Sequence, residues 1–227
     1  MSEEREVSIP VGETGGEVSG LLLMPEEPNA ILVFGHGAGA GMRHPFMAHT
    51  ARDLAMRGIA TLRYQFPYMD AGRGRVDPQD IAEATVRAAI HAARQEIPEV
   101  PLFAGGKSYG GRMTSNALAK QHDALVRGIV FYGFPLHMPK KPSRDRAEHL
   151  AAVQVPMLFV QGTRDELADL GLISEVVAEL GDRATLHIVA GGDHSFAVLK
   201  REGRTAAAVH LELATAVADW IDETAAV

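Results

Sequence analysis

The chain of 227 residues contains no cysteine. A disulfide framework, a thiolate metal site and a thiol nucleophile are therefore all excluded. Any nucleophile in this protein must use oxygen or nitrogen.

Long apolar runs are also missing, since no stretch approaches the roughly 18 residues of a membrane span. The first six residues are acidic and polar, and basic residues are outnumbered: 22 Lys and Arg stand against 29 Asp and Glu, for a net charge of −7. This balance argues against nucleic acid or an anionic membrane as the main partner. We therefore expect a cytoplasmic protein with neither of these partners.

The length suits one domain of the α/β kind, and such a chain can bury roughly 70% of its unfolded surface. No internal repeat divides the sequence, and no linker interrupts it. We therefore expect residues 1–227 to form a single domain.

Apolar runs that suit buried strands alternate with amphipathic stretches that suit helices. Two segments around a glycine turn at 12–16, residues 7–11 and 18–24, predict a leading hairpin. Further strands are expected at 30–34, 59–64, 101–104, 126–132, 156–161 and 185–189. Helices are expected at about residues 45–57, then after an Asp77 cap with Pro78 as the first helical residue, and then from residue 111. Further helices are expected at 146–153, at 170–180 and at the C-terminus. The pattern predicts a mostly parallel central sheet, covered by helices on both faces, with the hairpin as an antiparallel edge.

The segment Gly106-Lys107-Ser108-Tyr109-Gly110 fits the pattern G-x-S-x-G between a predicted strand and a predicted helix. In this setting a sharp turn lifts the serine hydroxyl above the sheet, and the flanking glycines leave room for it. We therefore predict that Ser108 is a nucleophile.

Two other interpretations of the glycine-rich segments are weaker. A phosphate-binding P-loop would need glycine where Pro101 stands, so its cradle of amides would be incomplete. The segment from Gly35 to Ala40 fits the looser dinucleotide pattern G-x-G-x-x-A, but no acidic residue ends the next strand to hold a ribose.

A serine nucleophile needs a base, and this kind of fold supplies an acid after a later strand and a histidine after the last one. Asp165 ends the turn after residues 156–161, and His194 ends a glycine loop after residues 185–189. We predict that His194 is the general base and that Asp165 orients it. Asp193 adjoins His194 and neighbours on a loop seldom face one another, while Glu166 is a less favoured substitute.

Most other histidines are expected to have surface or packing roles, because they fall within predicted helices or strands: His44, His49, His91, His187 and His210. The backbone amides of Tyr109 and Ala38 are the candidates for an oxyanion hole, one directly after the nucleophile and one in the first glycine-rich loop. We expect His36 to brace that loop.

The chain resembles α/β-hydrolases related to dienelactone hydrolase. More closely, it resembles the family that includes the testis-expressed hydrolase-like protein and the regulatory subunit of the NSL histone-acetyltransferase complex. The matching pieces span nearly the whole chain: His36 to Gly39, Gly105 to Gly110, Phe134 to His137, Gln161 to Asp165 and Gly192 to Ser195. The resemblance implies the α/β-hydrolase fold and a hydrolase without a cofactor or a metal. It departs from dienelactone hydrolase at the nucleophile, where a thiol is expected and Ser108 stands.

A loop rich in proline and basic residues runs from residue 135 to 146 and is too short to be the cap domain of larger hydrolases. It follows a strand, so we expect it at the rim of the pocket, with His137 as a substrate-binding residue. The loop carries four basic residues, Lys140, Lys141, Arg144 and Arg146. This run of charge predicts either a solvated surface or recognition of an acidic ligand.

These residues together predict a serine hydrolase that cleaves an ester, thioester or amide of a small molecule through an acyl-enzyme. The alternative is a non-catalytic interaction module that keeps the fold. A homo-oligomer or a protein partner is compatible with either hypothesis.

Overall fold

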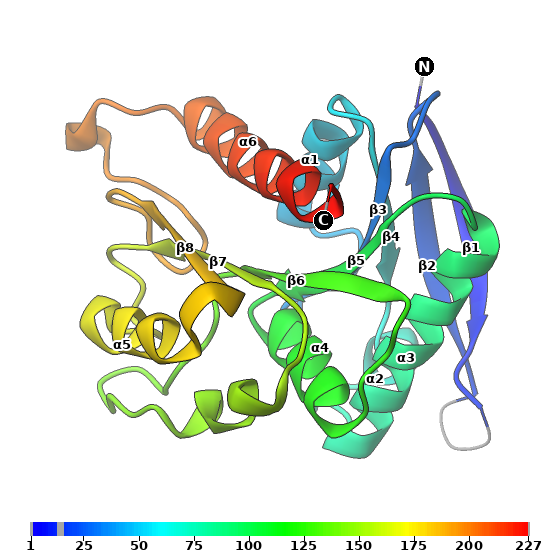
Figure 1. Cartoon of the computed structure of the whole chain (residues 1–227), viewed down its shortest axis with the longest axis horizontal. Coiled ribbons are helices and arrows are strands. Elements are labelled where there is room, and N and C mark those ends of the chain that lie inside the picture. The colour runs from blue at the N-terminus through cyan, green and yellow to red at the C-terminus, as the bar shows by residue number, and fades with distance from the viewer. Residues whose placement is uncertain (1, 13–15, 227) are drawn as a thin grey trace.

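The computed structural model describes residues 2–12 and 16–226. Within them, the strands form one sheet in the order β1-β2-β4-β3-β5-β6-β7-β8 (Figure 1). The strands are β1 Glu3–Pro10, β2 Glu17–Met24, β3 Ala30–Gly35, β4 Ile59–Tyr64, β5 Leu102–Lys107, β6 Val126–Tyr132, β7 Met157–Gly162 and β8 Ala184–Val189.

The sheet has the predicted strand directions. β1 and β2 form an antiparallel hairpin, β2 pairs antiparallel with β4, and all pairs from β4 to β8 are parallel. The ends of the predicted glycine turn, Gly12 and Gly16, both have positive φ. Its middle residues 13–15 lie outside the described part of the chain.

Helices cover both faces of the sheet, as predicted. Figure 1 shows α1 and α6 on one face and α2, α3, α4 and α5 on the other. Their bounds are α1 Pro45–Ala55, α2 Pro67–Asp70, α3 Gln79–Glu96, α4 Tyr109–Lys120, α5 Leu170–Leu180 and α6 Ala206–Ala225. None of the described helices is long and apolar enough to cross a membrane.

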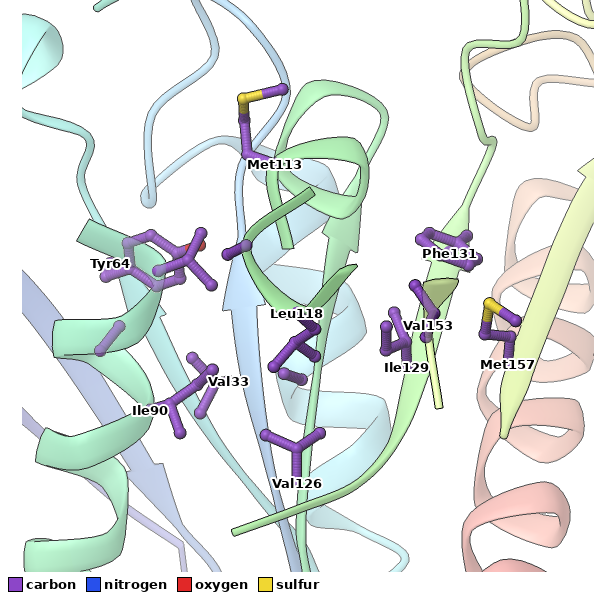
Figure 2. Close-up of a cluster of buried hydrophobic side chains, with 14 of the residues drawn as sticks. Val33, Tyr64, Ile90, Met113, Leu118, Val126, Ile129, Phe131, Val153 and Met157 are labelled. Atoms are coloured by element: carbon purple, nitrogen blue, oxygen red, sulfur yellow. The ribbon is translucent and has the colours of Figure 1, made fainter. Parts of the chain in front are cut away.

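A hydrophobic core lies on each side of the sheet, because side chains alternate between its faces. On the side of α3 and α4, Val33 and Phe131 of the sheet belong to one buried cluster with Ile90 and Leu118 of the helices (Figure 2). The predicted inward face of the last helix is also confirmed: Leu213, Val217 and Trp220 are buried in the second cluster. The two cores hold the carboxyl ends of the parallel strands along one edge of the sheet.

The predicted helix at 146–153 is wrong in type, because the structure has a 3₁₀ helix, η1, at Asp145–Ala152. Its buried residues Ala147 and Leu150 are three apart, which matches the three-residue turn of a 3₁₀ helix. Three short elements were also not predicted: α2, η2 at Gly181–Arg183 and η3 at Lys200–Glu202.

The predicted Asp77 cap of the third helix is also wrong. Pro78 occupies the cap position and no side chain caps the helix. The Asp77 carboxylate instead accepts a hydrogen bond from the Tyr68 backbone nitrogen (2.9 Å) and pairs with Arg73 (2.7 Å). A guanidinium is a stronger partner than a neutral amide, so the carboxylate turns toward the α2 loop.

Candidate active site

Ser108 lies at the sharp turn between β5 and α4. Its φ of 50° and ψ of −110° place it in a region that residues other than glycine rarely adopt. The turn is crowded, because a Cβ on Gly106 or on Gly110 would lie 2.4 or 2.3 Å from the carbonyl oxygen of Gly35. Glycine is therefore required on both sides of Ser108.

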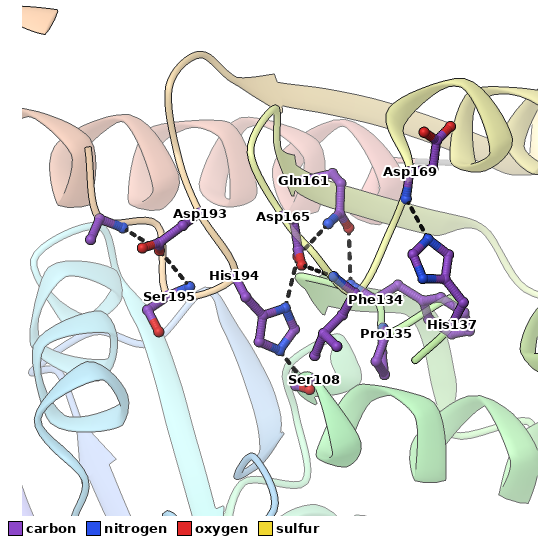
Figure 3. Close-up of polar contacts among 12 residues, drawn as sticks. Ser108, Phe134, Pro135, His137, Gln161, Asp165, Asp169, Asp193, His194 and Ser195 are labelled. Carbon is purple, nitrogen blue, oxygen red and sulfur yellow. Dashed lines mark hydrogen bonds and ion pairs between the residues drawn. The ribbon is translucent and has the colours of Figure 1, made fainter. Parts of the chain in front are cut away.

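The structure brings Ser108, His194 and Asp165 into one chain of hydrogen bonds (Figure 3). Nε2 of His194 lies 2.9 Å from Oγ of Ser108, and Nδ1 lies 2.7 Å from Oδ2 of Asp165. Asp165 follows β7 and His194 follows β8. These strands are parallel neighbours, so the loops after them meet at the same edge of the sheet.

The Asp165 carboxylate is buried and held by further donors. Oδ2 accepts a hydrogen bond from Nε2 of Gln161 (2.6 Å), and Oδ1 accepts one from the Leu167 backbone nitrogen (2.8 Å). Oε1 of Gln161 accepts a hydrogen bond from the Phe134 backbone nitrogen (3.0 Å). Gln161 is not among the predicted site residues, although a glutamine inside an otherwise apolar strand is a signal in the sequence.

The competing carboxylates do not contact the His194 ring. Asp193 holds its own loop, since Oδ1 accepts hydrogen bonds from the backbone nitrogens of Ser195 (2.8 Å) and Ala197 (2.9 Å). Glu166 is exposed. Of these three carboxylates, Asp165 is the one that contacts the His194 ring.

The loop after β3 lies beside Ser108, because a Cβ on Gly37 would lie 4.0 Å from Cβ of Ser108. Within the described part of the chain, neither the Ala38 amide nor the Tyr109 amide donates a hydrogen bond. Both amides are thus free to donate to a reacting oxygen, as an oxyanion hole requires.

His36 braces this loop, in agreement with the expectation. Nδ1 contacts the Gly37 carbonyl oxygen at 2.7 Å, and Nε2 accepts a hydrogen bond from the Phe66 backbone nitrogen at 3.3 Å. Burial lowers the pKa of His36, so the ring is neutral and both nitrogens serve the backbone.

A lysine ammonium lies next to the hydrogen-bonded chain. Nζ of Lys107 is buried, has no hydrogen-bond partner among the residues that the structure describes, and lies 5.6 Å from the centre of the Phe196 ring. A Cβ on Gly133 would lie 3.1 Å from this Nζ and 3.4 Å from Oδ2 of Asp165, so both groups flank the same glycine. Burial lowers the pKa of Lys107 to about 8, although Asp165 and Asp193 act in the opposite direction.

His137, the expected substrate-binding residue, is buried with both ring nitrogens occupied by the backbone. Nδ1 contacts the Met138 carbonyl oxygen at 2.9 Å, and Nε2 accepts a hydrogen bond from the Asp169 backbone nitrogen at 2.8 Å (Figure 3). These contacts favour a role in bracing the loop over direct contact with a substrate.

The basic loop is only partly a solvated surface. Lys140 and Lys141 are exposed, whereas Arg144 pairs with Glu175 (3.4 Å) and with Glu179. Arg146 turns inward toward the carbonyl oxygens of Pro135 and His137. No described group of three or more His, Asp or Glu side chains could hold a metal ion.

Solved structures share this fold over nearly their whole length. The chain is similar to a dienelactone hydrolase from Anabaena variabilis, with a TM-score of 0.76 and 21% identity over 98% of each chain. An α/β serine hydrolase without a lid from Xanthomonas campestris has a TM-score of 0.74 and 19% identity, over 97% of this chain and 94% of that one. Est1E from Butyrivibrio proteoclasticus has a TM-score of 0.71 and 17% identity, over 98% and 99%.

Among curated proteins, the chain is 27% identical over 197 residues to a Mycobacterium tuberculosis protein that carries the provisional name of a phosphoribosyl transferase. The match covers 85% of this chain but 42% of that protein. The chain thus spans less than half the length of the curated relatives that it matches.

Residues 28–222 match the family described as Alpha/beta hydrolase domain. They include the β5 turn, the β7 turn and the loop after β8. The narrower resemblance to the testis-expressed and NSL-complex proteins is not shown by these comparisons. The fold, the sheet topology and the matched residues establish that the chain belongs to the α/β-hydrolase family.

Proposed function

We propose that this chain is a serine hydrolase that cleaves an ester, thioester or amide of a small molecule. The hydrogen-bonded chain from Ser108 through His194 to Asp165, at 2.9 and 2.7 Å, supports this proposal most directly. All the strands described lie in one sheet, so we also propose that the chain acts as a single domain.

In this mechanism Nε2 of His194 removes the proton of Ser108 as Oγ attacks the substrate carbonyl carbon. The Asp165 carboxylate holds the ring in the tautomer that carries its proton on Nδ1, and stabilises the imidazolium that forms. His194 then donates the proton to the leaving group. A water molecule, activated by the same ring, releases the acid and restores Ser108.

Negative charge develops on the former carbonyl oxygen as the tetrahedral intermediate forms. The Ala38 and Tyr109 amides are the donors proposed for this oxygen, and each such donor can contribute about 3 kcal/mol. His36 supports the first of them by holding the loop after β3 to Phe66.

The name of the mycobacterial relative suggests another reaction, which we do not extend to this chain. The match covers 42% of that protein, so the rest of it lies outside the comparison. The groups assembled here suit attack by a hydroxyl on a carbonyl carbon.

A fluorophosphonate probe tests the proposal, followed by a panel of 4-nitrophenyl esters of increasing acyl length. We expect labelling at Ser108 and hydrolysis of at least one ester, and loss of both in Ser108→Ala. Absence of labelling in folded wild-type protein would overturn the proposal and favour the non-catalytic module.

A further inference from the structure

Arg112 and Arg146 lie within electrostatic reach of each other, because burial and then the charge of Arg146 lower the pKa of the Arg112 guanidinium. Arg112 comes from the first turn of α4 and Arg146 from the start of η1, and both side chains are half-buried. In the described part of the chain, neither residue makes an ion pair, and the Arg112 side chain makes no hydrogen bond.

Both arginines lie near a contact between α4 and η1. A hydrogen bond of 2.7 Å joins Oγ of Ser115 to Nε2 of His149. Arg112 precedes Ser115 by three residues and Arg146 precedes His149 by three. Three residues are about one turn in either type of helix, so both arginines lie one turn from this hydrogen bond.

Arg112 also lies close to Ser108 along α4. Its backbone nitrogen donates a hydrogen bond to the Ser108 carbonyl oxygen (3.1 Å), so it lies one turn, about 5.4 Å of rise, beyond Ser108. Helix side chains tilt toward the helix N-terminus, which here is the turn that carries Ser108.

Arg146 contacts the loop after β6, where its Nη2 also donates a hydrogen bond to Sδ of Met138 (2.9 Å). Its Nη1 donates hydrogen bonds to the carbonyl oxygens of Pro135 (3.4 Å) and His137 (3.3 Å). In Figure 3, Pro135 lies between Ser108 and His137. The carbonyl oxygen of Tyr132, at the end of β6, accepts the Ser108 backbone hydrogen bond (3.0 Å).

The other charged groups nearby are already engaged or neutral. Glu83 pairs with Lys120 (3.3 Å), and Asp77 pairs with Arg73 (2.7 Å). Burial, and then the charge of Arg112, lowers the pKa of His149 to about 4, so this ring adds no positive charge near pH 7. Within the described part of the chain, no carboxylate forms an ion pair with either arginine of this cluster.

We propose that Arg112 and Arg146 form an anion subsite beside Ser108 that binds a carboxylate carried on the acyl part of the substrate. A planar guanidinium fork matches the two oxygens of a carboxylate. The subsite rests on the proposed hydrolase function and narrows it to monoesters or monoamides of dicarboxylic acids. In this proposal an acidic ligand is recognised by Arg112 and Arg146 and not by the exposed Lys140 and Lys141.

The test compares two esters of equal chain length, mono-4-nitrophenyl adipate and its neutral methyl ester. The measured quantity is the kcat/KM of the anionic ester divided by that of the neutral one. We expect Arg112→Gln to lower this ratio about tenfold to hundredfold, the usual effect of losing a hydrogen bond to a charged group. Arg112→Lys keeps the charge but loses the fork, so its ratio should lie between wild type and Arg112→Gln.

Matched controls remove the same charge from exposed positions on the 137–146 loop. Lys140→Gln and Lys141→Gln should leave the ratio within about threefold, because salt screens exposed charges. Arg112 is the cleaner test residue, since Arg146 also holds the carbonyl oxygens of its own loop. A ratio in Arg112→Gln as high as in wild type would overturn the subsite.

Calorimetry separates failure of the subsite from failure of the hydrolase proposal. Monomethyl adipate is titrated into Ser108→Ala protein and into the Ser108→Ala, Arg112→Gln protein. If the binding of monomethyl adipate depends on Arg112 but the wild type hydrolyses neither ester, the subsite is supported and the proposed function is overturned. If the wild type hydrolyses both esters, and monomethyl adipate binds to neither variant or equally to both, the subsite alone is overturned.

Discussion

Nε2 of Gln161 donates a hydrogen bond of 2.6 Å to Oδ2 of Asp165, the same oxygen that contacts His194. Gln161 is fully buried at the end of β7, and its Oε1 accepts the backbone hydrogen bond of Phe134. One side chain thus links the proposed orienting carboxylate to the loop after β6.

Gln161→Leu should lower kcat/KM for an ester about tenfold to hundredfold, because the Asp165 carboxylate loses a donor. The free energy of unfolding should fall by about 1–3 kcal/mol, since the Phe134 amide is left without a partner. Gln161→Glu keeps an acceptor for Phe134 but sets a second carboxylate against Asp165, so its activity should also fall. The exposed Gln154→Leu is the control, and equal activity in Gln161→Leu and Gln154→Leu would contradict the positioning role.

Ser108→Ala and His194→Ala should each reduce kcat/KM about ten-thousandfold or more while the protein still folds. The double variant should be little worse than either single one, because the two residues act as a unit. Steady-state kinetics with a 4-nitrophenyl ester, and circular dichroism for folding, check this expectation. Losses that multiply in the double variant would mean that the two residues act independently.

Gly106→Ala should destabilise the protein by about 3 kcal/mol or more, because its Cβ would clash with three backbone atoms. These atoms are the Gly35 carbonyl oxygen at 2.4 Å, the Gly111 nitrogen at 2.7 Å and the Gly110 carbonyl carbon at 2.8 Å, and backbone atoms cannot move away by changing a rotamer. For a chain of this length the expected fall in Tm is roughly 6–12 °C. Gly74→Ala is the matched control, because nothing lies within 4 Å of its Cβ position. A similar Tm for the two variants would contradict the crowding at the turn.

Lys107→Met should raise the free energy of unfolding at pH 7, because it removes a buried charge without a hydrogen bond. Burial lowers the pKa of the Lys107 ammonium in the folded state to about 8 from an ordinary value of 10.5. The buried charge therefore destabilises the folded protein to its full extent below about pH 8. Between pH 8 and 10.5 the unfolded chain binds more protons than the folded one, and stability therefore rises with pH.

The difference in unfolding free energy between wild type and Lys107→Met should thus shrink from the order of 3 kcal/mol at pH 7 toward zero above pH 10. Urea unfolding at pH 7, 8, 9 and 10 measures this difference, with exposed Lys141→Met as the control. A difference that stays constant from pH 7 to pH 10 would show that the Lys107 ammonium keeps its ordinary titration when folded.

The sequence by itself determined the order and type of most elements, because the evidence for them is local. A strand buried on both faces is a continuous apolar run such as residues 30–34, and a sharp turn around a serine needs glycines two positions away on each side. The sequence also indicated Ser108, Asp165 and His194 as partners, since parallel strands bring the loops after them to one edge of the sheet.

Only the tertiary structure decided which side chains meet across segments that are far apart in sequence. Asp77 turns away from its helix toward the Arg73 guanidinium and the Tyr68 amide, and no local pattern encodes that choice of partners. Strand pairing brings Gln161 and Phe134 together, and helix packing does the same for Ser115 and His149. Such contacts depend on the summed packing of the whole core, whereas strands, helices and sharp turns depend on a few consecutive residues.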